Sequence, residues 1–139
     1  MAPTRLGESK FGKQSQSMAP SLATVKAGDV PGLAAFYAAQ KPLPGKVEDS
    51  ALTAAGKKLY DGGNEASGVA ACGSCHLPKG EGDANNPRLA GQHPAYTIQQ
   101  MNDFKAGTRN NDKGRVMRVV AARMTESEIR AVAEYLAGL

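Results

Sequence analysis

The sequence lacks tryptophan and has few other aromatic residues, with three phenylalanines and four tyrosines among 139 residues. Few large side chains are therefore available to fill a hydrophobic core. The chain is instead rich in alanine and contains 16 glycines, a composition that lets helices pack closely. Such helices could surround a bulky group that supplies core volume, or could form a plain alanine-rich domain, and composition alone does not separate the two.

Long hydrophobic runs and clusters of like charge are also missing. No apolar stretch is long enough to cross a bilayer. No secretory signal opens the chain, so we expect either that one was removed or that the chain is a truncated fragment. The formal net charge is +4 and the pI is about 9.2. Lysine and arginine are scattered, which argues against specific nucleic-acid binding. The charge favours acidic partners or peripheral association with an anionic membrane surface.

The apolar residues predict an all-α fold, because they recur with the period of a helix and nowhere alternate as in a strand. We expect helices at 29–40, 50–60, 94–106 and from residue 126 onward. Ser50 is the expected cap of the second helix, and Thr125 with Glu128 forms a capping box for the last. Gly56 lies inside the second helix, where glycine costs stability but allows another helix to cross closely.

The two cysteines lie three positions apart and are followed directly by a histidine, in Cys72-Gly73-Ser74-Cys75-His76. Two thiols at this spacing on one helical turn can both reach the vinyl groups along one edge of a haem. The thioether bonds would attach the haem covalently, and His76 would be its proximal iron ligand. We therefore predict one covalently bound haem c.

Three other roles are open to the cysteine pair. A thioredoxin-like dithiol belongs near βαβ units, which this sequence does not predict. A zinc site with His76 and His93 would have poor ligand spacing. A disulfide that closes so small a loop would stabilise little. Haem attachment is the interpretation that fits the motif best.

A methionine thioether opposite the histidine would complete a haem site suited to electron transfer. Met101 lies on the apolar face of a predicted helix, and Met124 directly precedes the cap at Thr125, so both are expected to pack against helices. Met117 is placed in a loop just ahead of the last helix, where its side chain can point inward. Met117 is therefore the predicted distal iron ligand.

Residues 1–45 are interpreted as a separate extension, joined by a linker with prolines and a glycine to a haem domain at 46–139. When Met18 is aligned with Met117, the helix at 29–40 falls on the last helix and their apolar positions match. We interpret the extension as the tail of a second, similar domain. The alternative is that two alanine-rich helices match through periodicity alone.

From about residue 50 onward the chain resembles the class I cytochromes c, and within them the cytochrome c4 family. The likeness rests on Gly56, Tyr60, the motif from Cys72 to His76, Gly80-x-Gly82, Pro87-Arg88-Leu89-Ala90-Gly91-Gln92, Tyr96, Phe104-Lys105-x-Gly107-x-Arg109, Met117 and Tyr135-Leu136. The resemblance implies the class I cytochrome c fold, with helices wrapped around one covalent haem. It independently supports Met117 as the axial ligand. The family often has glycine after the haem histidine, and Leu77 at that position implies a local change in the loop.

The resemblance also implies roles that the residues alone do not show. The carbonyl group of Pro87 would accept a hydrogen bond from the ring of His76, and Arg88 and Tyr96 would contact the haem. Gly56 would meet Tyr135 where the first and last helices of the domain cross.

The implied function is periplasmic electron transfer by one-electron cycling of a haem, and not enzymatic catalysis. The partners would be redox proteins such as a quinol-oxidising complex, a terminal oxidase or a dehydrogenase. One alternative is a haem subunit fixed to a dehydrogenase or oxidase. Another is a gas-binding haem sensor, which would require that Met117 be labile as a ligand.

Overall fold

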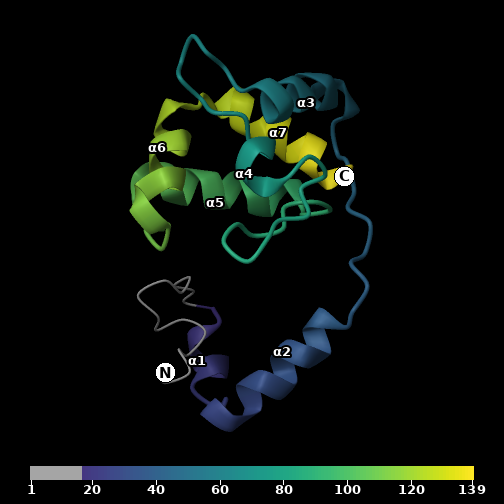
Figure 1. Cartoon of the computed structure of the whole chain (residues 1–139), viewed down its shortest axis with the longest axis vertical. Coiled ribbons are helices and arrows are strands. Elements are labelled where there is room, and N and C mark those ends of the chain that lie inside the picture. Colours follow the sequence, from purple (N-terminus) through teal and green to yellow (C-terminus); the bar gives the residue numbers. More distant parts are fainter. Residues whose placement is uncertain (1–16) are drawn as a thin grey trace.

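The computed structural model describes residues 17–139, which consist of helices and loops (Figure 1). Within this range the β-type pairing is limited to an isolated bridge between Asn64 and Val69. The α-helices are α1 Ala19–Leu22, α2 Val30–Ala38, α3 Thr53–Gly62, α4 Gly73–His76, α5 Pro94–Ala106, α6 Val116–Arg123 and α7 Glu126–Ala137, with 3-10 turns at Ala27–Asp29, Ser50–Leu52 and Lys113–Arg115. The prediction of an all-α fold is confirmed. No helix in the described range is long and apolar enough to span a bilayer.

Helix α7 is the centre of the core, with α3 packed on one side and α5 on the other (Figure 1). Its predicted apolar positions are all buried, namely Ile129, Val132, Ala133 and Leu136. The predicted capping box is present: the hydroxyl of Thr125 accepts the backbone N–H of Glu128 at 3.2 Å, and the Glu128 carboxylate accepts that of Thr125 at 2.7 Å. These bonds satisfy two N–H groups that the first turn of a helix leaves without partners.

Replacing Thr125 with alanine is expected to lower the free energy of unfolding by about 1 kcal/mol, because Glu128 N–H loses its acceptor. Urea unfolding of the haem-loaded protein, followed by circular dichroism, measures the change. Arg130→Ala is the control, since it replaces an exposed side chain of the same helix away from the cap and should change stability by no more than about 0.5 kcal/mol. An equal loss in both variants would contradict the capping role.

The crossing of α3 and α7 depends on a glycine. A Cβ atom built on Gly56 would clash with the carbonyl oxygen of Ala131 and lie 2.8 Å from Cβ of Tyr135. Gly56 is buried, so the two helix backbones approach more closely than any side chain at this position permits. The predicted meeting of Gly56 and Tyr135 is confirmed.

Two local predictions are wrong. The cap before α3 is Asp49 and not Ser50, because the Asp49 carboxylate accepts the N–H of Ala51 at 3.1 Å and a 3-10 turn precedes the helix proper. Met117 does not lie in a loop: it is the second residue of α6, a helix that the sequence analysis did not predict. Met117, Val120, Ala121 and Met124 all contribute to the core cluster, so α6 has its own apolar stripe.

The N-terminal part of the described chain lies apart from these packed helices, at the opposite end of the long axis (Figure 1). Helix α2 confirms the helix expected within 29–40, but none of its residues is buried, and Phe36 and Tyr37 are 59% and 70% exposed. The linker already packs against the helices at Gly45, where an added Cβ atom would clash with the carbonyl oxygen of Ala137. It is also bound at Glu48, whose backbone N–H donates to the buried Glu134 carboxylate at 2.8 Å. Residues 1–16 of the predicted extension lie outside the described residues.

Candidate haem site

The cysteine motif forms a single helical turn, α4. The backbone N–H groups of Cys75 and His76 both donate to the carbonyl of Cys72, at 3.2 and 2.9 Å. Cys72 is half-buried and packs against the core, whereas Cys75 is exposed, and both carry free thiols. His76 is only 6% exposed. The turn therefore presents two thiols and a buried imidazole from one short segment.

The imidazole of His76 is oriented by the loop that follows it. Its Nδ1 atom lies 2.8 Å from the carbonyl oxygen of Pro87. Because a carbonyl oxygen can only accept, Nδ1 carries the proton in the neutral ring, and the lone pair is then on Nε2. A histidine held in this way is prepared to ligate a metal through Nε2, with the carbonyl group fixing its tautomer.

Tyr60, on α3, supports the motif through a hydrogen bond to the residue after His76. Its side chain is fully buried, and its hydroxyl group donates to the carbonyl of Leu77 at 2.5 Å. Leu77 has φ 66° and ψ 158°, a region that glycine favours and other residues enter at a cost. The residue after His76 thus has a backbone conformation typical of glycine, although it is a leucine. Burial, followed by the charge of the nearby Cys72, raises the pKa of Tyr60 to about 12, so the hydroxyl stays protonated as a donor.

The alternative roles of the cysteines find little support in the site. Burial raises the pKa of the Cys72 thiol to about 11, whereas a redox-active dithiol needs a lowered thiol pKa. His93 is exposed at the start of α5. In residues 17–139 no three His, Cys, Asp or Glu side chains come together as a metal site. A structural zinc ion requires four such ligands.

The other predicted site residues lie on three different elements. Met117 is partly buried in the first turn of α6 and packs against the same core cluster as Cys72. Arg88 is exposed next to Pro87 in the loop. Tyr96 lies in the first turn of α5 and is 38% exposed. The structure thus brings Pro87 to His76 directly, and places Met117 and Cys72 against a common core.

The contacts that hold the loop between α5 and α6 were not predicted from the sequence. The Arg109 guanidinium lies 4.3 Å from the centre of the Phe104 ring and donates to Gln100 at 2.9 Å. Further along, Asp112 and Arg118 form an ion pair with Nε and Oδ1 2.7 Å apart. In none of these contacts are the two residues four positions apart, the spacing that would predict a pair on one face of a helix. Gly114, which has φ 65°, is a local signal of a special turn before α6.

Residues 53–139, which include every helix from α3 to α7, match the family described as cytochrome c. The chain belongs to the cytochrome c family. Its cofactor is accordingly covalent haem c, and its packed helices have the class I cytochrome c fold.

Within this family the chain is similar to the cytochromes c4. It is 44% identical to cytochrome c4 of Azotobacter vinelandii over 80% of this chain and 54% of that protein. It is 39% identical to cytochrome c4 of Thiocapsa roseopersicina over 97% and 71%. The crystal structure of reduced cytochrome c4 from Pseudomonas stutzeri superposes with a TM-score of 0.86 at 37% identity, covering 99% of this chain and 74% of that one. The chain thus spans about half to three quarters of the length of these relatives.

The thiosulfate dehydrogenase electron acceptor of Thiomonas intermedia is 37% identical over 81% of this chain and 54% of that protein. Cytochrome c4 is an electron-transfer haem protein, and the Thiomonas intermedia relative is an electron acceptor of thiosulfate dehydrogenase.

The residues of the site fit a covalent haem. The thiols of Cys72 and Cys75 are unpaired, and His76 is buried with Nδ1 engaged by Pro87, which leaves Nε2 as the donor atom. The thiols can form thioethers with the vinyl groups of a haem, and the imidazole can ligate its iron. The largest fully buried side chains in the described range are Tyr60, Met124 and Ile129, a small core that a haem would extend.

Proposed function

We propose that the protein is a periplasmic one-electron carrier with a single haem held by Cys72 and Cys75 and ligated by His76 and Met117. The observation that carries the proposal is the buried His76 ring, with Nδ1 2.8 Å from the Pro87 carbonyl, inside the turn that bears both cysteines. When bound, haem supplies an iron that takes up and releases one electron without changing its ligands.

The protein residues supply attachment, orientation and exclusion of water. Cys72 and Cys75 would form the thioether bonds, and Pro87 would set the orientation and basicity of the His76 imidazole. A Met117 thioether on iron would raise the reduction potential relative to a second imidazole. Arg88 and Tyr96 would contact the haem from the loop and from α5. No part of this assignment needs a catalytic group, and the protein is proposed to act without transforming a substrate.

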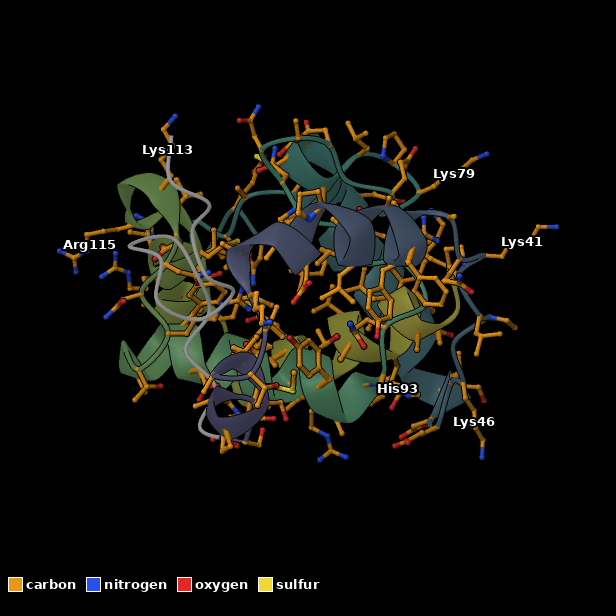
Figure 2. The ribbon with its side chains drawn as sticks, turned by 90° about the horizontal axis from the view of Figure 1, so that it is seen from below. Lys41, Lys46, Lys79, His93, Lys113 and Arg115 are labelled. Atoms are coloured by element: carbon orange, nitrogen blue, oxygen red, sulfur yellow. The ribbon has the colours of Figure 1, made fainter. Side chains whose placement is uncertain are left out.

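An acidic redox protein is the proposed partner. Lys79 follows the haem motif, and Lys113 and Arg115 precede Met117; all three are exposed. Figure 2 shows their side chains pointing outward, with Lys113 and Arg115 together on one side and Lys79 on the other. Cations near the two ligand-bearing segments would steer an anionic partner toward the haem through a small, transient contact.

A haem subunit acting with a dehydrogenase is the second candidate. It is favoured by the likeness to an electron acceptor of thiosulfate dehydrogenase. Copurification of a dehydrogenase in fixed stoichiometry with this protein would favour that role. A protein that purifies alone, yet is reduced rapidly by several donors, would favour the free carrier.

Residues 1–45 are proposed to be the tail of a second cytochrome domain, with the haem domain at 46–139. Support comes from α2, whose apolar Leu33, Phe36 and Tyr37 are all exposed. A helix with this composition normally buries its apolar side chains against other helices. The likeness to Thiocapsa roseopersicina cytochrome c4 over 97% of this chain also includes this segment.

The axial assignment is tested by Met117→Leu, which keeps the size of the side chain and removes the thioether. The variant is expected to lose the near-infrared charge-transfer band of ferric His/Met haem and to bind carbon monoxide when ferrous. Its reduction potential should fall by on the order of 0.1 V or more, because axial ligands set haem potentials over several tenths of a volt. Absorption spectroscopy and a redox titration of the periplasmically matured protein measure these changes.

Met101→Leu is the matched control, because it makes the same replacement at a buried core position on α5. It should leave the band and the potential unchanged. Retention of the band in Met117→Leu would show that another residue ligates the iron. Rapid carbon monoxide binding by the unaltered protein would favour the gas-binding alternative.

A further inference from the structure

The loop that leads into α6 is held by a nearly buried carboxylate. The Asp112 side chain is only 4% exposed. Its Oδ2 accepts the backbone N–H of Arg118 at 3.0 Å, and its Oδ1 accepts Nε of the same residue at 2.7 Å. Burial alone would raise the pKa of Asp112, but the hydrogen bonds from Arg118 and its positive charge hold that pKa below its ordinary value. The carboxylate is therefore ionised and bound at two points to one residue.

Asp112 does for α6 what an N-cap residue normally does. The N-cap position is occupied by Arg115, whose side chain has donors only and makes no cap hydrogen bond. Arg118 is the third residue of α6, and its N–H is one of the first-turn donors that a cap satisfies. The Asp112 carboxylate reaches this N–H from three residues before the cap. The position of the first turn of α6 thus depends on a side chain outside the helix.

The backbone between Asp112 and α6 is strained, so contacts at its ends must fix it. Gly114 and Arg115 are consecutive residues with φ 65° and 61°. Arg115 has a side chain, and this backbone region is costly for it. Without the bonds to Arg118, the segment has other backbone conformations open to it in which the first turn of α6 is shifted or frayed.

Met117 lies in this first turn, directly before Arg118. We propose that Asp112 is a positioning residue: by binding Arg118 at two points, it holds the first turn of α6 so that the Met117 thioether stays on the iron. The inference rests on the proposed function, in which Met117 is the distal ligand. In this proposal the Asp112–Arg118 pair strengthens the bond between the iron and the methionine, in addition to stabilising the loop.

The test compares two ion pairs in the haem-loaded protein. Asp112→Ala breaks the buried pair, and Asp61→Ala breaks the exposed pair between Lys57 and Asp61 on α3. The measured quantity is the pH at which the near-infrared methionine–iron band disappears as another ligand replaces the thioether. In Asp112→Ala this pH should fall by about one unit, since losing a charge-assisted hydrogen bond loosens the turn roughly tenfold. Asp61→Ala should leave it unchanged.

Two further variants keep the test decisive. Asp112→Asn retains one acceptor oxygen and the side-chain shape, and should give a smaller shift in the same direction. Arg118→Gln leaves the backbone N–H and removes the guanidinium. Its near-infrared band should also disappear at a lower pH than in the unaltered protein. This variant decides the test if no Asp112 variant matures with haem. Circular dichroism at neutral pH should show unchanged helix content in each variant.

The outcomes separate this inference from the proposed function. In one outcome, Met117→Leu loses the band, but Asp112→Ala loses it at the same pH as the unaltered protein. The positioning role is then overturned and Met117 remains the ligand. Arg118→Gln replaces Asp112→Ala in this comparison if the latter does not mature with haem. If Met117→Leu retains the band, the ligand assignment itself fails and the inference fails with it. Lowered unfolding temperature without a shift in the band would show a structural role only, and would also overturn the proposal.

Discussion

Replacing both Cys72 and Cys75 with serine is expected to reduce covalently bound haem from one per chain to none. Serine hydroxyls do not form thioethers with vinyl groups, and the remaining His76 would hold haem through a reversible bond only. The loss should also unfold much of the domain, because the core of the described chain has few large side chains, with Tyr60, Met124 and Ile129 the largest that are fully buried. A haem assay on denatured protein, after maturation in the periplasm, counts the attached groups.

Ser74→Ala is the control within the same turn. Ser74 is exposed, and its hydroxyl group donates to the carbonyl of Ala71 at 2.6 Å. It contributes no atom to attachment, so the variant should retain one haem per chain. The single variant Cys75→Ser should keep one thioether and a shifted absorption spectrum. Covalent haem in the double serine variant, or a colourless unaltered protein, would contradict the assignment of the motif.

Much of the fold follows from local signals that the sequence displays. The capping box at Thr125 and Glu128 and the apolar stripe behind it place α7 without reference to the rest of the chain, and Pro94 and Gly107 do the same for α5. Helix α6 was missed because it is only eight residues long and its cap comes from Asp112, outside the usual cap position. A pattern of neighbouring residues does not show such a contact.

The site was predictable where its chemistry lies in consecutive residues, and less so where it depends on the path of the chain. The spacing of Cys72, Cys75 and His76 is itself the motif. The Pro87 carbonyl is a backbone atom 11 residues away from His76, so resemblance to a family implied it and spacing did not. The Tyr60 hydroxyl on Leu77 joins residues 17 apart. Such contacts require knowledge of how the loops fold back.

Replacing Gly56 with alanine is expected to destabilise the protein by at least about 3 kcal/mol, at the upper end of what overpacking in a core costs. The added Cβ would clash with the carbonyl oxygen of Ala131 and lie 2.6 Å from its carbonyl carbon. Both are backbone atoms of α7, which cannot rotate away as a flexible side chain would. The higher helix propensity of alanine, about 1 kcal/mol over glycine, offsets only part of this cost. Urea unfolding of the haem-loaded protein measures the difference.

Gly62→Ala isolates the clash from the change in propensity, because Gly62 lies in the same helix and a Cβ atom there would meet nothing within 4 Å. That variant should be neutral or more stable by up to about 1 kcal/mol. Opposite effects of one substitution at two positions of α3 can only come from what each new methyl group meets. If Gly56→Ala proved as stable as Gly62→Ala, the helices would have room to separate, and the close approach of α3 and α7 would not be what fixes the packing around the haem motif.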